Sequence, residues 1–490
     1  QIQLGDKTLA VFVIWSGEYQ ERFGLLIRRD KLPAFQAICR RERVNCEVLG
    51  EITGDGHITV TDSNDGTTPV RLNLKDILGE LPQKTFESKR IERKLEPAVL
   101  PAGLSFRDAL KMTLQQLSVG SKGFLVHKVD RSVTGLVAQQ QCCGPAQVPI
   151  ADIQVGADSY FAPTGVASAI GEQPLKMLID SDAGARRAVA EMTTNLMAAG
   201  GIQLPMVRCR ANWMWAAKLE GEGSRLYDAA VSMSKAMIGL GIATDGGKDS
   251  LSMATRIGEE LVKAPGELVV MGYVSMPDIT KILTPDIKEP GRGRLGLISL
   301  GQGKNRLGGS ALLQALNQLG NDCPDCDMQQ LKSLWKAVQA LHECGSFLSL
   351  HDVSDGGLAT TVCEMCLGGN SGFETNQLLS IPFWFNEECG IVFEYLPEEA
   401  AVITRILASH GLGFLDIGKT SSGSDPRVLG IPLTQIRQWW ELTSHELEKL
   451  QTKNGVAEEE FAGYSVVENP CYRLTFAPSN LAVEKGATRP

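Results

Sequence analysis

The sequence predicts an α/β (α+β) protein with several domains. Its 51 glycines cluster at the ends of apolar runs, a pattern typical of strands that lead into Gly-rich turns. At 490 residues the chain has room for roughly three domains of ordinary size. Apolar residues make up 43% of it and charged residues 21%, which is enough apolar material for several hydrophobic cores.

The charge balance excludes two classes of partner. The formal net charge is −9, so no basic excess exists to displace counterions, and we expect neither nucleic acid nor an anionic membrane as a partner. The longest apolar runs, residues 10–15 and 268–274, are far shorter than the ~20 residues that cross a bilayer. The 12 scattered cysteines without a signal-like stretch predict reduced thiols and a cytoplasmic location. Because the chain opens at Gln1 without a Met, we expect a piece of a longer polypeptide.

Composition shifts along the chain predict its organisation. The first unit contains expected strands at residues 11–15 and 23–27 and an expected helix at 33–40. The predicted units are residues 1–85, a charged and polar linker at 86–101, residues 102–283, residues 290–432, and a helix followed by a linker at 433–490.

A predicted helix carries two oxygen donors on one side. It starts at Ser181 or Asp182, whose side-chain oxygen is expected to cap it, and ends before Gly200. Glu191 and Asn195 are four residues apart and therefore project from the same side. The alternative is a solvated Glu beside an incidental Asn.

Two aspartates strengthen the case for a cation site. Asp152 and Asp352 each follow a short apolar strand, and α/β folds collect ligands at strand ends. Mg²⁺ prefers oxygen ligands and commonly shares them with phosphate groups. Together with Glu191 and Asn195, these carboxylates predict a magnesium site.

Two Gly-rich segments supply candidate phosphate contacts. Residues 244–250, with Gly247, Lys248 and Ser250, are predicted to form a loop that combines free backbone N–H groups, a cation and a hydroxyl. Ser354 begins a second such segment at the start of a helix. Each segment taken singly is more often a tight turn than a ligand site.

Histidine and cysteine give weaker signals. His351 lies beside Asp352, a context in which a structural role is the commoner one. The pairs Cys323-Pro-Asp-Cys326 and Cys363-Glu-Met-Cys366 have a zinc-like spacing. The second pair lies in an apolar helical stretch, so we favour small core residues over zinc ligands.

Longer motifs carry a family resemblance. The sequence resembles the phosphoribosylformylglycinamidine synthases over nearly its whole length. The matching motifs are Glu18-Tyr-Gln-Glu-Arg22, Asp130-Arg-Ser-Val-Thr-Gly135, Gly144-Pro-Ala-Gln-Val-Pro149, Ala169-Ile-Gly-Glu-Gln-Pro174, Asn212-Trp-Met-Trp-Ala-Ala217, Gly221-Glu-Gly223, Asp245-Gly-Gly-Lys-Asp-Ser-Leu-Ser-Met253 and His351-Asp-Val-Ser-Asp-Gly-Gly357.

The resemblance implies a fold and a reaction. The fold is a tandem of subdomains similar to aminoimidazole ribonucleotide synthetase, each half with an N-type and a C-type part. The reaction is an ATP-dependent ligation in purine synthesis, which joins formylglycinamide ribonucleotide to ammonia from glutamine. This chain resembles the part from the first C-type subdomain to the linker before the glutaminase, so the partners expected in the same polypeptide are an N-terminal half and a glutaminase domain.

Site residues follow from the resemblance motif by motif, with ATP or ADP and Mg²⁺ as the implied cofactors. No catalytic residue is expected in this segment, and the second-half nucleotide site is largely auxiliary in the family. Tyr19 stands where a serine is usual, which weakens the substrate motif around it. The implied nucleotide contacts are Ala151, Ser354, Gly247 and Lys248; the implied substrate contacts are Glu18, Gln20 and Ser250; the implied Mg²⁺ ligands are Asp152, Glu191, Asn195 and Asp352.

Two other functions stay open at this point. One is a catalytically silent relative that keeps the fold as a nucleotide-bound scaffold or interaction protein. The other is an aminoimidazole ribonucleotide synthetase, against which the motif that begins at Asn212 argues.

Overall fold

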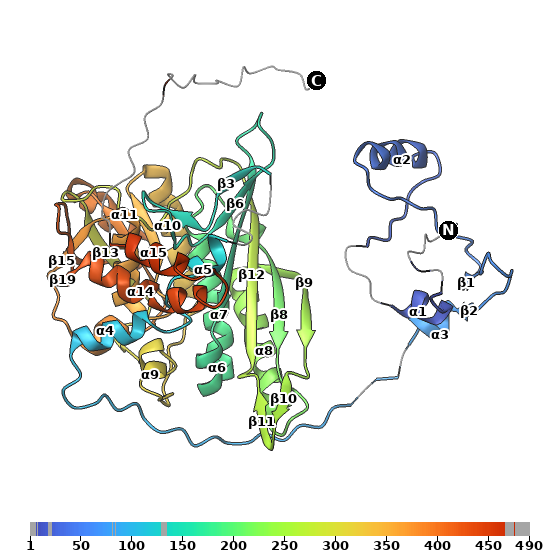
Figure 1. Cartoon of the computed structure of the whole chain (residues 1–490), viewed down its shortest axis with the longest axis horizontal. Helices are drawn as coiled ribbons and strands as arrows, with labels where there is room; N and C mark the ends of the chain where they lie inside the picture. Colours follow the sequence, from blue (N-terminus) through green and yellow to red (C-terminus); the bar gives the residue numbers. More distant parts are fainter. Residues whose placement is uncertain are drawn as a thin grey trace. The chain divides into compact units, whose positions relative to one another are not determined.

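The computed structural model describes residues 6, 8–17, 22–80, 82–83, 85–128, 135–465 and 475. The chain forms two compact units, residues 1–86 and 87–490, each described here by itself (Figure 1). Glu18 and Gln20 lie outside the described residues, so their predicted substrate contacts stay predictions.

The first unit contains short elements with few buried residues. They are α1 (Val11–Ser16), α2 (Leu32–Arg41), α3 (Leu74–Leu78) and an antiparallel hairpin of β1 (His57–Val60) and β2 (Val70–Asn73). The helix expected at 33–40 is confirmed by α2. The strands expected at 11–15 and 23–27 are wrong, since the first is helical and the second forms no regular element. Apolar β-branched residues favour strands only where neighbours pack against them, and α1 buries none of its residues.

The second unit begins with an extended segment, residues 87–101, that forms no helix or strand. Arg90 donates to Asp228 at 2.8 Å, and Arg93 donates to the buried carboxylate of Glu222 at 2.8 Å. Both acidic partners lie on α8 (Glu222–Leu240), so the segment is tied to this helix by ion pairs rather than by a sheet.

One sheet and three helices build the first domain of this unit. Its strand order is β3-β6-β7-β12-β8-β9, with a parallel pair only at β8–β9 among the described strands (Figure 1). The helices α6, α7 and α8 lie to one side of this sheet, and α7 packs on β7 and β12. The bounds are β3 (Val137–Gln139), β6 (Gln154–Ala157), β7 (Gly165–Glu172), β12 (Glu267–Met276), β8 (Arg208–Met214), β9 (Ala243–Ser250), α6 (Pro174–Ile179) and α7 (Ser181–Leu196).

The second domain is built on a longer mixed sheet in the order β14-β16-β13-β17-β15-β18-β19. Its strands are β14 (Ser349–Asp352), β16 (Gly390–Tyr395), β13 (Arg294–Ser299), β17 (Leu415–Ser421), β15 (Gly372–Thr375), β18 (Arg427–Val428) and β19 (Ile431–Pro432), and its longer helices are α10 (Met328–Cys344), α11 (Gly357–Gly369) and α13 (Ala400–Ser409). Shorter elements of the unit are α4 (Phe106–Leu114), α5 (Gly123–Val126), β4 (Cys142–Cys143), β5 (Val148–Pro149), β10 (Ala254–Ile257), β11 (Glu260–Lys263), α9 (Ala311–Ala315) and α12 (Ile381–Phe385).

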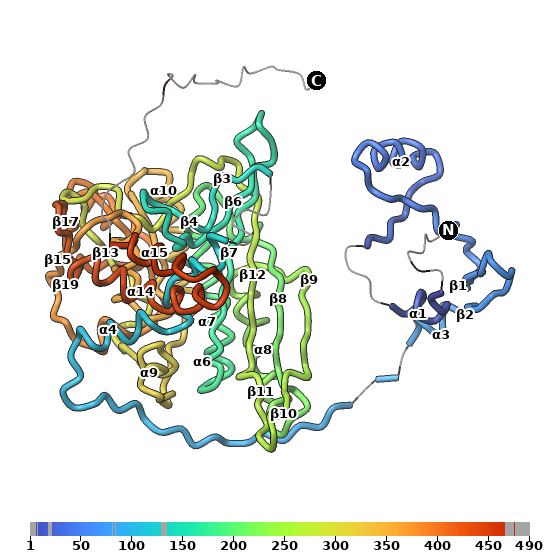
Figure 2. Tube along the Cα trace, in the orientation of Figure 1, coloured from blue at the N-terminus to red at the C-terminus, as the bar shows by residue number. Residues whose placement is uncertain are grey.

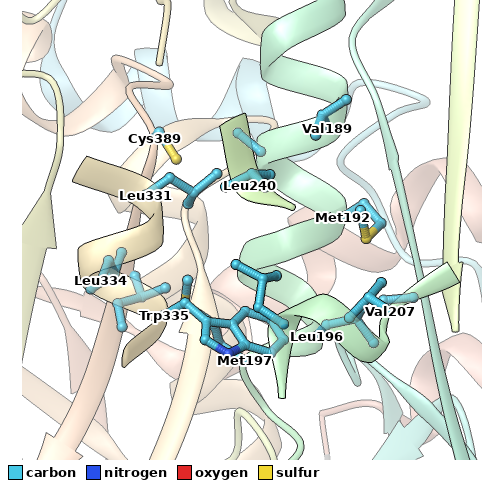
Figure 3. Close-up of a cluster of buried hydrophobic side chains, with 14 of the residues drawn as sticks. Val189, Met192, Leu196, Met197, Val207, Leu240, Leu331, Leu334, Trp335 and Cys389 are labelled. Carbon is cyan, nitrogen blue, oxygen red and sulfur yellow. The ribbon is translucent and has the colours of Figure 1, made fainter. Parts of the chain in front are cut away.

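The two domains share a hydrophobic core. Leu334 and Trp335 of α10 belong to the same buried cluster as Met192 and Leu196 of α7 (Figure 3). Each of these four side chains is buried. Removing this much apolar surface from water stabilises the junction by about 1.5–3 kcal/mol per large side chain.

The helix expected at the start of residues 433–490 is confirmed as α14 (Leu433–Glu448). Its apolar side, with Ile436 and Trp440, is buried against α4 and α11. Figure 2 shows this C-terminal part in red beside α4 and α5, which come from the start of the unit. α15 (Val456–Gly463) follows and packs on α14. The described part of the chain contains no helix long and apolar enough to cross a membrane.

Candidate functional site

Three side chains form the centre of the site. Asp152 lies in the turn between β5 and β6, and His351 and Asp352 are the last two residues of β14. Their ligand atoms lie within 4.8 Å of one another, and their side chains are almost fully buried. The sequence predicted that Asp352 follows the strand, but in the structure Asp352 is the last residue of β14.

Two residues of this centre and the predicted ligand Asn195 each carry an unpaired oxygen. Among the described residues, Asp152 Oδ2, Asp352 Oδ2 and Asn195 Oδ1 are buried atoms without a hydrogen-bond partner. A buried acceptor without a partner costs about 1–3 kcal/mol, and more when it is charged. Such atoms are candidates for contact with an ion, a ligand or an ordered water.

The helix α7 supplies the other two predicted ligands. Glu191 Oε2 accepts from the backbone N–H of Glu172 at 2.7 Å and from Gln173 Nε2 at 3.0 Å. Asn195 Nδ2 donates to the carbonyl oxygen of Ile170 at 2.9 Å, which leaves its oxygen unpaired. All three partners lie on or directly after β7, so the close packing of α7 on β7 orients both side chains.

The caps of this helix differ from the expected ones. Asp180 caps α7 by accepting from the N–H groups of Asp182 and Ala183, and the helix ends at Leu196 rather than before Gly200. The capping residue is Asp180 rather than Ser181 or Asp182. The backbone is extended at Asp180, which places its carboxylate within hydrogen-bond distance of the first N–H groups of the helix.

Burial and mutual repulsion raise the pKa values of the clustered acids. Burial, and then the Asp152 carboxylate, raises the pKa of Asp352 to about 7. Burial, and then the carboxylates of Asp352 and Asp355, raises the pKa of Glu191 to about 8. Glu191 thus interacts electrostatically with Asp352. A bound cation would reverse this effect, because it favours the ionised form of each acid.

His351 is held between two carboxylates. Its Nδ1 lies 2.6 Å from Asp152 Oδ1, and its Nε2 lies 3.0 Å from Glu364 Oε2. Burial alone would lower the pKa of His351, but the two carboxylates outweigh burial and hold this pKa well above its usual value. With both ring nitrogens engaged, His351 is not available as a metal ligand in this arrangement.

The loop from Ser354 to Gly357 adjoins the centre. The Ser354 hydroxyl lies 3.5 Å from Asp352 Oδ1, and the N–H of Gly356 donates to Glu387 at 2.7 Å. A Cβ on Gly357, whose φ is +66°, would lie 2.3 Å from the carbonyl oxygen of Asn386. The loop therefore requires glycine to reach this position, and α11 begins at Gly357.

Two lysines adjoin the same loop. Lys176 of α6 is buried in an ion pair with Glu387, and its Nζ lies 3.6 Å from Asp355. Lys122 donates to the carbonyl oxygen of Gly120 at 2.6 Å. Burial lowers the pKa of Lys122, and the Glu364 and Asp355 carboxylates partly oppose this shift.

The Gly-rich loop predicted at residues 244–250 is a strand. Residues 243–250 form β9, an edge strand that pairs with β8, because Gly247 allows close contact where a Cβ would lie 1.9 Å from the carbonyl oxygen of Ala211. Lys248 donates to Ser250 at 2.7 Å, and no described hydrogen bond joins these residues to Asp152. β9 lies four strand steps from β6, about 19 Å along the sheet. Gly247, Lys248 and Ser250 are thus not brought to the Asp152 centre.

The cysteine pairs are core residues, as favoured from the sequence. Cys363 and Cys366 are fully buried in α11. Cys326 interacts with Cys389 rather than with the other pair. Among the described residues, the clusters with metal-ligand geometry include no cysteine.

Sequence reasoning missed the residues around the centre. No sequence pattern identified Glu364, Lys122 or the Lys176–Glu387 pair, because the residues that they contact are distant in the sequence. His351 did carry a signal, its position beside Asp352 at a strand end, but a bridge between two carboxylates was not predicted.

The residues present fit Mg²⁺. The donor set contains carboxylate and amide oxygens from three segments, and three of these oxygens are buried and unpaired. Hard divalent cations prefer such oxygens and share them with phosphate groups. The nearby helix start at Gly357 and the two lysines offer the donors and positive charge that a phosphate requires.

Comparison with known families identifies both domains. The family model described as FGAR-AT PurM_N-like domain matches residues 121–275. The one described as AIR synthase related protein, C-terminal domain, matches residues 296–430. These matches, together with the α/β sheets, confirm the predicted fold class of aminoimidazole-ribonucleotide-synthetase-like domains in tandem.

Curated relatives match the whole chain. The chain is 44% identical over 503 residues to a protein from Arabidopsis thaliana named probable phosphoribosylformylglycinamidine synthase, chloroplastic/mitochondrial. It is 42% identical over 525 residues to the phosphoribosylformylglycinamidine synthase of Homo sapiens. The alignments cover 98% and 100% of this chain but only 36% and 39% of these relatives. The chain therefore spans less than two fifths of their length.

A solved structure shares the fold. The structure described as T. maritima PurL complexed with FGAR matches with a TM-score of 0.51 at 14% sequence identity, over 68% of this chain and 53% of that chain. At this level of identity the likeness concerns the fold alone.

Proposed function

Because this chain is homologous along its whole length to one segment of the phosphoribosylformylglycinamidine synthases, we propose that it serves their reaction. In that reaction, formylglycinamide ribonucleotide, ATP and ammonia from glutamine give formylglycinamidine ribonucleotide, ADP and phosphate. The curated relatives in the comparison carry the name of this ligase, which favours the enzyme over a catalytically silent scaffold. The predicted cytoplasmic location stays a prediction, since the Arabidopsis relative is named as an organellar protein.

Within this role, the Asp152 centre is proposed to bind a nucleotide together with Mg²⁺. The observation that carries this proposal is the set of buried unpaired oxygens on Asp152, Asp352 and Asn195. These three residues and Glu191 are the proposed ligands of the cation. Bound Mg²⁺ supplies positive charge that neutralises phosphate oxygens.

This chain's own residues would orient the nucleotide. Ser354 and the N–H groups at the start of α11 are placed to contact phosphate oxygens, and Ala151 adjoins the same centre through the backbone. Gly247, Lys248 and Ser250 are not part of this proposal, since β9 holds them at the far edge of the sheet.

Measuring the nucleotide content and the thermal midpoint of the purified chain tests the proposal. Acid extraction is expected to release near one ADP or ATP per chain. Mg²⁺ with ADP is expected to raise the midpoint, because a ligand at a thousandfold excess over its Kd adds about 4 kcal/mol to the free energy of unfolding.

Isosteric variants connect this effect to the site. Asp152→Asn and Asp352→Asn are expected to lose most of the bound nucleotide and of the Mg²⁺-dependent shift. Asp278→Asn, which changes a half-buried carboxylate that accepts from Thr280 and lies far from the ligands in sequence, is the matched control and should keep both. An unchanged midpoint of the unsubstituted chain with Mg²⁺ and ADP contradicts the proposed site.

A further inference from the structure

A line of four side chains connects the proposed cation site to the C-terminal helix. Asp152 contacts His351 Nδ1, His351 Nε2 contacts Glu364 Oε2, and Trp440 Nε1 donates to Glu364 Oε1 at 3.2 Å. The four residues come from the β5–β6 turn, β14, α11 and α14. We call Asp152, His351, Glu364 and Trp440 the His351 network.

The network fixes the orientation of the Asp152 carboxylate. His351 engages Oδ1 at 2.6 Å, so the unpaired atom is Oδ2. The imidazole ring is itself held at its other nitrogen by Glu364, which prevents it from rotating away. A ligand carboxylate locked in this way loses less conformational freedom when it binds a cation.

Trp440 anchors the far end. Its side chain is only 1% exposed, and its Nε1 also contacts the carbonyl oxygen of Val119 at 3.1 Å. Its own carbonyl oxygen accepts from the N–H of Ser121 at 2.9 Å, next to Lys122. Since both carboxylate oxygens of Glu364 are engaged, by His351 and by Trp440, the Glu364 side chain has little freedom to move.

We propose that His351, Glu364 and Trp440 are positioning residues that hold Asp152 for the cation, an inference that rests on the proposed nucleotide site. None of the three touches the cation or the nucleotide in this arrangement. Outer partners of this kind change metal affinity by about 10–100-fold when they are removed.

The test measures the Kd of Mg²⁺ in the presence of ADP for the full chain, together with its thermal midpoint in EDTA. Glu364→Gln keeps the shape of the side chain but has one acceptor oxygen for two donors. It is expected to raise the Kd about 10–100-fold. Trp440→Phe removes the outer donor together with its contact to Val119 and part of a buried ring, and it is expected to raise the Kd by less, in the same direction.

A buried carboxylate outside the network provides the matched control. Glu441 lies next to Trp440 in the sequence and accepts from Arg437 at 2.7 Å, with no exposed surface. Glu441→Gln is expected to lower the midpoint in EDTA yet leave the Kd of Mg²⁺ unchanged. A merely structural role predicts instead that the Kd follows the midpoint in all variants.

Each possible result of this experiment either supports or contradicts the positioning role. An unchanged Kd in Glu364→Gln, or an equal rise in Glu441→Gln, overturns the positioning role while leaving the nucleotide site intact. If Glu364→Gln does not fold, Trp440→Phe decides by the same criterion. Absence of Mg²⁺-dependent ADP binding in the unsubstituted chain overturns the proposed site, and the positioning role with it.

Discussion

At the scale of residues, the centre places several carboxylates where water does not reach them. In the chain without a cation, burial and neighbouring acids raise the pKa of Asp352 to about 7 and that of Glu191 to about 8. Protons and a cation therefore compete for the same oxygens, because metal ligands must be deprotonated. This competition makes cation affinity and stability depend on pH.

The stability of the cation-free chain should fall as pH rises from about 5 to about 8, because unfolded carboxyls ionise near pH 4. Between these limits the folded state binds more protons than the unfolded state, so the free energy of unfolding decreases with pH. His351 acts in the same direction, since its raised pKa adds stability that is lost at higher pH. The thermal midpoint in EDTA, recorded across this range, measures the effect.

Mg²⁺ with ADP should then raise the midpoint more at about pH 8 than at about pH 6, because fewer protons must be displaced. Asp352→Asn serves as the control and should flatten most of this pH dependence. Equal shifts of the unsubstituted chain at both pH values would show that Asp352 and Glu191 are not cation ligands.

At the scale of elements, the contact between α7 and β7 sets the site. Gly171 of β7 lets the helix backbone approach, since a Cβ there would lie 2.2 Å from the carbonyl oxygen of Ala188 and 2.3 Å from the N of Met192. Glu191 lies between these two positions on the helix and bonds to the strand end at Glu172. Glu191 and Asn195, one acid and one amide four residues apart on α7, thus reach the end of β7 because Gly171 lets the helix approach the strand.

Gly171→Ala should therefore impair both stability and cation binding. The added methyl group meets backbone atoms, so α7 must shift, at a cost of about 1–3 kcal/mol. The expected result is a lower midpoint in EDTA and a higher Kd of Mg²⁺ with ADP. Gly413→Ala is the control, because nothing lies within 4 Å of a Cβ there. A Gly171→Ala protein that binds Mg²⁺ as tightly as the unsubstituted one would refute this view of α7.

At the scale of the whole molecule, the described parts of the site all lie in the unit of residues 87–490. Its two domains meet at the shared core of α7 and α10 and at the buried Lys176–Glu387 pair. Glu387 also accepts from the N–H groups of Ala311 and Gly356, so one side chain joins both domains to the loop beside the Asp152 centre.

Limited proteolysis between the two units should leave the site intact. Phe86 at the boundary is 85% exposed, which favours cleavage there. The larger fragment should keep the midpoint shift caused by Mg²⁺ with ADP, because every contact described for the site lies within it. Loss of the shift on cleavage, with the fragment still folded, would mean that residues 1–86 contribute to nucleotide binding.

Local pattern was sufficient for much of this protein. The four-residue spacing on one helix predicted that Glu191 and Asn195 lie on the same side. The ends of apolar strands pointed to Asp152 and Asp352, and an apolar helical stretch predicted that Cys363 and Cys366 are core residues. Each of these signals depends on a single helix or strand and can therefore be read from nearby residues alone. The family motifs added the order of the domains. Local pattern failed at two segments. Residues 11–15 were predicted as a strand but form a helix, because no strand among the described residues packs against their β-branched side chains. Residues 244–250 were predicted as a loop but form a strand, because β8 lies beside them as a pairing partner.

Only the tertiary structure decided which distant residues meet. His351 contacts Asp152 from 199 positions away, and Lys176 pairs with Glu387 from 211 positions away. Such pairs depend on how α7, α11 and α14 pack around the two sheets, and no periodicity in the sequence records that packing. The sequence therefore determined which side chains could hold a cation. The packing of the two domains determined which other side chains orient these candidate ligands.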